Sequence, residues 1–325
     1  MEEKAQQLYK EGSDFFKNGH FSEALASCNK ALVLRPDYAE AWNGRGVALA
    51  ELRQPAEALA SYDKALSLRP DYADAWNNRG WVLVELGRDA EAVNSYDQGL
   101  ALNPEDASAW FIRGAELGIL GRHTEALASF DKSIAINPDD AYAWNFRGVA
   151  LHELGRYTEA VTSYDKAIAI NPISADAWNK RGVALHHLGW YSEAITAHDK
   201  AIVINPVSAD AWNNRGYALG NLGKYEDALD SFDKAIAINP DDAKAWYARG
   251  FVLYSMGQFI DGIDSFDKAI TLNPDDANAW YARGFGQFKM GDYTDAIASY
   301  DKAIAINPDF TEARQNREIA IQRKE

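Results

Sequence analysis

Prolines recur along this chain at a fixed interval of 34 residues, and tryptophans follow the same interval. A period of this length indicates one supersecondary unit repeated in tandem, in which each unit buries its apolar side against its neighbours. Such an array presents a long surface rather than a single catalytic cleft, so we expect a binding function. The periodic prolines are Pro36, Pro70, Pro104, Pro138, Pro172, Pro206, Pro240, Pro274 and Pro308, and the tryptophans of the same period run from Trp42 to Trp280.

Each unit contains two stretches of helical spacing joined by a turn. In residues 39–72, Trp42 and Gly46 share one face of the first stretch, and Ala58 and Tyr62 share one face of the second. This spacing predicts two amphipathic helices in each unit. We expect small residues such as Gly46 and Ala58 to face each other and to let the two helices approach closely.

The turn between the two helices carries a residue suited to ending a helix. In seven of the eight units that carry the periodic tryptophan this residue is a glycine, which can take the left-handed conformation. In the unit that begins at Ala39, Arg53 stands there instead, and Pro55 follows where a missing N–H costs little. Segments such as residues 137–140, with the sequence Asn-Pro-Asp-Asp, are expected to end the second helix and to supply N-cap oxygens for the next.

Charge and composition narrow the kinds of partner. The chain of 325 residues has a formal net charge of -15, which opposes contact with nucleic acid or an anionic membrane, so we expect partners that are neutral or basic in part. No apolar run approaches the ~20 residues that span a bilayer, and the start of the chain does not look like a targeting segment. We therefore expect a cytoplasmic protein. The single cysteine, Cys28, replaces an aromatic or histidine of the other units, which predicts burial rather than redox chemistry.

The pattern of one unit resembles the tetratricopeptide repeat (TPR) family, and it recurs in register over essentially the whole chain. The resemblance implies an all-α fold, a right-handed α-solenoid superhelix of helix–turn–helix repeats whose first helices line a concave groove. It also implies a single array over residues 1–325. In one unit the family's signature positions are held by Trp76, Gly80, Leu83, Ala92, Tyr96 and Pro104. The expected repeats are residues 5–38, 39–72, 73–106, 107–140, 141–174, 175–208, 209–242, 243–276 and 277–310, followed by a capping helix at 311–325.

An arginine stands before the signature glycine, where the family usually has leucine, and an aspartate recurs in the second helices. We interpret the two rows as a structural ladder of ion pairs rather than as a ligand site. The first repeat changes both places together, to Glu11 and Asn29, which favours pairing inside a repeat. In contrast, Arg317 has only the preceding Asp301 available, which favours pairing between repeats, so the register stays open. The arginines are Arg45, Arg79, Arg113, Arg147, Arg181, Arg215, Arg249 and Arg283.

The resemblance places the candidate binding residues on the groove face of the first helices. Asparagine amides there can both donate to and accept from a peptide backbone, and clustered aromatic side chains often mark contact sites. Two alternatives remain: exposed asparagines also serve solubility, and the aromatic rings could pack against one another. The candidate amides are Asn43, Asn77, Asn78, Asn145, Asn179, Asn213 and Asn214. The candidate aromatic residues are Trp81, Phe111, Tyr142, Phe146, Tyr217, Tyr247, Phe251, Tyr254, Tyr281, Phe285 and Phe288.

These features predict a non-catalytic scaffold that binds an extended peptide or a partner helix in the groove. No phosphate-binding glycine loop, nucleophile elbow or spaced cysteine pair is present, so we expect neither an enzyme nor a cofactor. One alternative is a structural oligomer that assembles through its terminal helices. A weaker one is metal binding by His152, His186 and His187, which lack the i, i+4 spacing of a helical metal site.

Overall fold

The computed structural model describes all 325 residues as α-helices joined by short turns, without a β-strand. This confirms the predicted all-α fold of helix pairs. The chain forms two compact units, Met1–Ile170 and Asn171–Glu325, which we describe separately. The expectation of a single array stays a prediction.

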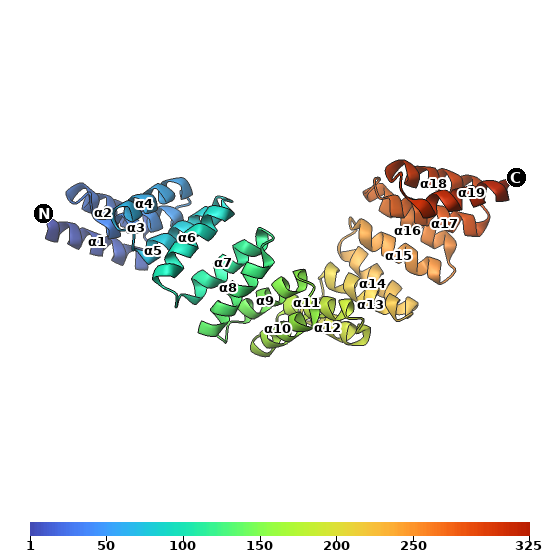
Figure 1. Cartoon of the computed structure of the whole chain (residues 1–325), viewed down its shortest axis with the longest axis horizontal. Helices are drawn as coiled ribbons and strands as arrows, with labels where there is room; N and C mark the ends of the chain where they lie inside the picture. The colour runs from blue at the N-terminus through green and yellow to red at the C-terminus, as the bar shows by residue number, and fades with distance from the viewer. The chain divides into compact units, whose positions relative to one another are not determined.

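The first unit consists of five helix pairs. Within it, each helix packs against the next helix of the chain (Figure 1). The pairs are α1 (Glu2–Lys17) with α2 (Phe21–Leu34), α3 (Ala39–Glu51) with α4 (Pro55–Leu68), α5 (Ala73–Glu85) with α6 (Asp89–Leu102), α7 (Ala107–Ile119) with α8 (His123–Ile136), and α9 (Ala141–Glu153) with α10 (Tyr157–Ile170).

The second unit consists of four helix pairs and a last single helix, again packed in chain order. Odd-numbered helices also contact one another, as α13 does with α15 and α15 with α17. The pairs are α11 (Ala175–His187) with α12 (Tyr191–Ile204), α13 (Ala209–Asn221) with α14 (Tyr225–Ile238), α15 (Ala243–Ser255) with α16 (Phe259–Leu272), and α17 (Ala277–Met290) with α18 (Tyr293–Ile306). The last helix is α19 (Thr311–Lys324).

A hydrogen bond explains why tryptophan and proline share one period. The indole Nε1 of Trp76 donates to the carbonyl oxygen of Pro70 at 2.8 Å, and the same bond forms between Trp246 and Pro240 at 2.9 Å. The proline cannot continue the preceding helix, and the tryptophan of the next helix then bonds the carbonyl of the connecting turn. Each repeat is thereby tied to the one before it.

The periodic glycines of the first helices face an aromatic ring of the second helix. A Cβ added to Gly46 would lie 2.5 Å from Cε1 of Tyr62, closer than real contacts allow. The expected small partner, Ala58, is therefore not the nearest contact, although it is fully buried. The glycine makes room for the large ring, which fills the core between the two helices.

The turns and caps follow the sequence pattern. Arg53 takes a positive φ of 60°, as expected from its place at the glycine position, and Gly155 has a φ of 71°. Pro55 begins α4. At the start of α9 the Asp140 carboxylate accepts from the backbone N–H groups of Tyr142 and Ala143.

The arginine ladder pairs between repeats, which settles the register. Arg113 Nε donates to Asp97 Oδ1 of the preceding repeat at 2.6 Å, and its Nη1 donates to Ser129 Oγ of its own repeat at 2.6 Å. The ladder begins at Arg45, which bonds Asn29 instead of an aspartate. The same pairing joins Arg79 to Asp63, Arg147 to Asp131, Arg215 to Asp199, Arg249 to Asp233, Arg283 to Asp267 and Arg317 to Asp301.

Truncating a ladder arginine should destabilise the first unit more than truncating its aspartate. We expect Arg113→Ala to lower the free energy of unfolding by about 2–3 kcal/mol, because its side chain is only 15% exposed and its loss takes away the donor to the Ser129 hydroxyl, which keeps only its own bond to the Glu125 carbonyl. Asp97 is 46% exposed, so in Asp97→Ala a water molecule can accept the hydrogen bond of Arg113 Nε in place of the carboxylate. This variant should lower the free energy of unfolding by about 1 kcal/mol or less. Urea unfolding followed by circular dichroism measures both.

The control is Arg122→Ala. Arg122 precedes α8 and forms a surface ion pair with Glu125 in the first turn of that helix. The control variant should change stability far less than Arg113→Ala. Equal effects of the two arginine variants would show that the ladder does not stabilise the unit.

Burial of the single cysteine is confirmed. The Cys28 side chain is 2% exposed, and burial raises the pKa of its thiol to about 11. The thiol therefore stays protonated and unreactive at neutral pH.

Candidate functional site

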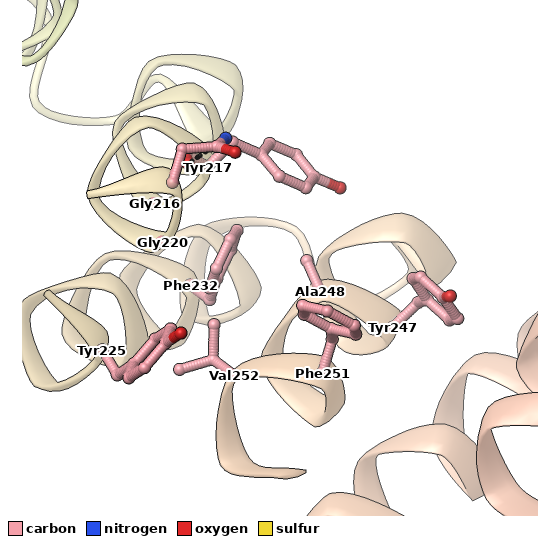
Figure 2. A pocket seen from close by; sticks show the side chains of 10 residues that line it. Gly216, Tyr217, Gly220, Tyr225, Phe232, Tyr247, Ala248, Phe251 and Val252 are labelled. Atoms are coloured by element: carbon pink, nitrogen blue, oxygen red, sulfur yellow. Dashed lines mark hydrogen bonds between the residues drawn. The ribbon is translucent and has the colours of Figure 1, made fainter. Parts of the chain in front are cut away.

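An aromatic-lined pocket of about 310 Å³ lies between α13, α14 and α15 in the second unit. In Figure 2, Tyr225 stands on one side of it, Tyr247 and Phe251 stand on the other, and Phe232 lies between them. Tyr217 and Val252 also line the pocket. The helix pair α13–α14 and the first helix of the next repeat thus form the walls together.

The pocket has a buried base and an exposed wall. Phe232 is almost fully buried and meets Tyr217 edge-on at 5.3 Å between ring centroids. Phe251, on the wall that faces solvent, is 56% exposed. The wall that faces solvent is therefore apolar, as in pockets that bind small molecules or side chains.

The polar groups at the pocket are neutral. Burial, with a smaller contribution from nearby Asp242, raises the pKa of Tyr217, and burial with Asp276 does the same for Tyr247. Both phenols stay protonated at neutral pH and can donate hydrogen bonds. None of the lining side chains carries a charge, so the pocket favours a neutral, apolar group.

Most candidate asparagines bond within the protein. Asn43 is buried, donates to Tyr72 Oη at 3.4 Å, and accepts from Asn78 Nδ2 at 3.1 Å. Asn77 Nδ2 donates to Asp106 Oδ2 at 2.9 Å. These amides link neighbouring first helices in the first unit.

The remaining candidate asparagines are also buried or half-buried. Asn145 is buried, and Asn213 is half-buried. In the second unit Asn214 Nδ2 donates to Asn179 Oδ1, which also lies 2.9 Å from His198 Nδ1. The structure therefore brings Asn179 and Asn214 together, but as part of the packing between repeats.

The candidate aromatic residues of the first unit divide into packed and exposed rings. Phe111 meets Phe146 edge-on at 5.3 Å, as expected if groove aromatics pack between neighbouring first helices. Trp81 and Tyr142 remain exposed. Exposed rings of this size leave two positions on α5 and α9 available for contact.

The late aromatic residues pack mainly against one another. The ring of Tyr281 lies tilted against that of Phe310, with 4.9 Å between centroids, and its hydroxyl accepts from Asn316 Nδ2 at 2.9 Å. Phe285 lies 5.4 Å from Tyr254. Of the six candidate aromatic residues on α15 and α17, only Tyr247 and Phe251 line the pocket. The others are Tyr254, Tyr281, Phe285 and Phe288.

Sequence reasoning missed Gly220 and Tyr225 of the pocket lining. Gly220 lies outside the turn and outside the close contact between paired helices, which are the two places where the repeat pattern calls for glycine. The sequence could have indicated Gly220, because the neighbouring repeats carry a ring, His186 or Tyr254, at the same position in the last turn of the first helix.

The candidate histidines do not form a metal site. His186 Nε2 lies 2.9 Å from Asn221 Nδ2, and its ring meets Tyr191 edge-on. His152 contacts Tyr157 in the same way. No group of three or more His, Cys, Asp or Glu side chains is placed to hold a metal ion, so the metal alternative gains no support. None of the helices combines the length and apolar character needed to cross a bilayer.

Sequence models of tetratricopeptide repeats match nearly the whole chain. Three of them are described as tetratricopeptide repeat and one as TPR repeat. A search of curated proteins gave no match. The matched residues are 9–73, 48–96, 77–141, 129–162, 148–189, 186–223, 209–242, 243–276 and 277–310.

Solved structures agree with this assignment. The chain is 25% identical to YrrB, a TPR protein with an unusual peptide-binding site, over 58% of this chain and 97% of that one, with a TM-score of 0.51. A tetratricopeptide repeat protein from Parabacteroides merdae is 22% identical over 77% of this chain and 99% of that one, with a TM-score of 0.53. Part of a TPR repeat-containing protein from Cytophaga hutchinsonii is 18% identical over 74% and 98%, with a TM-score of 0.62. The chain therefore belongs to the tetratricopeptide repeat family, whose fold is typical of protein–protein interaction scaffolds.

Proposed function

We propose that the protein is a non-catalytic scaffold that binds an extended peptide or a partner's helix along its first helices. The observation that carries the proposal is the apolar pocket beside the exposed Phe251 in the second unit. Exposed aromatic side chains next to a pocket are the usual anchors of protein recognition. The candidate amides that bond within the protein, such as Asn43 in the first unit and Asn179 in the second, hold the first helices of their own unit together rather than contact the ligand.

The relative of known structure supports a peptide as the ligand. YrrB has a peptide-binding site, and the present chain shares a quarter of its residues over nearly all of that protein. The net charge of -15 adds a preference for a ligand that is neutral or basic in part.

A random peptide library displayed on phage tests the proposal. We expect the purified full chain to select peptides, and a selected peptide labelled with fluorescein to bind in an anisotropy titration. Phe251→Ser should weaken this binding by about tenfold or more, because it removes an exposed ring at the pocket without opening the core.

The matched control is Val203→Ser. Val203 is 77% exposed and lies on α12, a second helix, so this variant removes a similarly exposed apolar side chain away from the first helices. It should change the dissociation constant by less than about twofold. If the library yields no specific peptide, or if both variants weaken binding equally, the proposal fails.

A further inference from the structure

In five repeats, two rings meet across the turn between the first and second helix. One ring lies in the last turn of the first helix, and the other is the first residue of the second helix, five positions later. The centroids of each pair are 5.1–5.4 Å apart, in the edge-on or tilted geometry that aromatic rings favour. The pairs are Phe16 with Phe21, His152 with Tyr157, His186 with Tyr191, Tyr254 with Phe259, and Phe288 with Tyr293.

The repeat that contains the pocket breaks this pattern. Tyr225 begins α14, but the residue five positions earlier is Gly220. A Cβ added to Gly220 would meet no atom within 4 Å, so the place of the missing ring is open. Gly220 and Tyr225 both line the pocket.

The next repeat shows how a ring sits at this position. There Tyr254 lies 5.3 Å from Phe259 on one side and 5.4 Å from Phe285 on the other. The residues one period earlier are Tyr225 and Phe251, and both line the pocket on opposite sides (Figure 2). The pocket thus keeps both neighbours of the ring but lacks the ring itself.

Size and chemistry of the pocket fit an aromatic side chain. Its volume is about 310 Å³, whereas a cavity of roughly 150 Å³ already holds benzene. Its walls are aromatic and aliphatic, with uncharged hydroxyl and amide groups and no ionised side chain. A neutral ring gains contact on two sides, while a charged side chain would lose its water without finding a partner.

We infer that the pocket takes a phenylalanine or tyrosine side chain of a bound polypeptide, held between Tyr225 and Phe251 in the place that Tyr254 occupies in the next repeat. The inference rests on the proposed function and adds the anchor residue of the ligand. The occupant supplies in trans the ring that this repeat lacks.

Fluorescein-labelled peptide pools test the inference. Each pool has nine residues, with the central one fixed as Phe, Tyr, Leu or Ala and the others randomised, and is titrated against the full chain by anisotropy. We expect the Phe and Tyr pools to bind about tenfold more tightly than the Ala pool. Gly220→Phe should abolish this preference, because the chain's own ring then fills the pocket.

The matched control is Gly118→Phe. Gly118 holds the same place in α7 of the first unit, and a Cβ there also meets nothing within 4 Å. This variant should keep the aromatic preference. Phe251→Ala, which alters an exposed wall, provides a second variant should Gly220→Phe fold poorly, and it should also reduce the preference.

The outcomes separate this inference from the proposed function. If no pool binds above background, the proposed function fails and the inference with it. If pools bind without a preference for the central residue, or if the Leu pool binds as tightly as the Phe pool, the scaffold function stands and the inference is wrong. A preference that persists in both Gly220→Phe and Phe251→Ala also overturns it.

Discussion

Gly148→Ala is expected to destabilise the first unit by about 3 kcal/mol, although alanine is the better helix former. The added Cβ would lie 2.5 Å from Cε1 of Tyr164 and 2.8 Å from Cδ1 and Cζ of the same ring. Tyr164 is 1% exposed and fills the core between α9 and α10, so the ring cannot move without displacing its neighbours. Overpacking of this kind outweighs the helix preference of alanine.

Amide hydrogen exchange of α9 and α10 measures this local effect better than a global melting curve, because repeat arrays do not unfold as one cooperative block. Gly118→Ala is the control, since a methyl group there meets no atom within 4 Å. It should leave stability unchanged or raise it by about 0.5–1 kcal/mol. Similar changes in protection for the two variants would contradict the role assigned to the Gly148–Tyr164 contact.

The helices and turns could be predicted from the sequence because the same pattern of residues recurs in every repeat. The period shared by Trp76 and Pro70 predicted a unit of fixed length, and the hydrogen bond from the Trp76 indole to the backbone carbonyl of Pro70 explains the shared period. Arg53 was identified as a turn residue only by its register with the glycines, and its φ of 60° confirms this. The period of the repeat thus predicts a left-handed turn even at a residue, such as arginine, that rarely adopts this conformation.

The same repetition hides which repeat supplies each contact. With a strict period, an arginine has an aspartate at a fixed distance both before and after it along the chain, so spacing alone cannot choose. The joint change of Glu11 and Asn29 suggested pairing within a repeat, but Asn29 accepts from Arg45 of the following one. Only the helix packing settles the choice.

The candidate site was predicted less well than the fold. Position in the repeat made Phe251 a candidate, and this side chain is exposed, but position could not show that Asn43 is buried and bonds Tyr72. Burial of an amide depends on the length of the side chains around it, which vary from repeat to repeat. Gly220 was missed because it contributes to the pocket by lacking a side chain, which leaves the space open.

The largest expected response to pH comes from His198 in the second unit. His198 holds the core place of the rings Tyr62, Phe130 and Phe232, and it is fully buried. Its Nδ1 lies 2.9 Å from Asn179 Oδ1, an acceptor, so Nδ1 carries the proton of the neutral ring. The buried Nε2 has no hydrogen-bond partner, and protonating it would place a charge in the core. Burial therefore lowers the pKa of His198 to about 3, with His186 and Arg215 contributing less.

The sign of the pH effect follows from this lowered pKa. In the unfolded chain histidine binds a proton near pH 6.5, while in the folded chain His198 stays neutral down to about pH 3. The stability contributed by the neutral ring is therefore fully present above pH 6.5 and is lost as the pH falls from 6.5 towards 3. We expect His198 to cost the second unit about 2–3 kcal/mol between pH 7 and pH 4.5.

His198→Phe should remove this acid sensitivity, because phenylalanine fills the same place in three other repeats and binds no proton. Hydrogen exchange of α11 and α12 at pH 7 and pH 4.5 should show a smaller loss of stability in the variant than in the unaltered protein. Tyr62→Phe changes the equivalent ring of the first unit without removing a group that titrates in acid, so it should keep the original pH dependence. Equal losses in His198→Phe and the unaltered protein would mean that other groups, such as the carboxylates of the ladder, control the acid response. One repeat has thus replaced a ring that never ionises in acid with one that does, and this single exchange makes the second unit sensitive to acid.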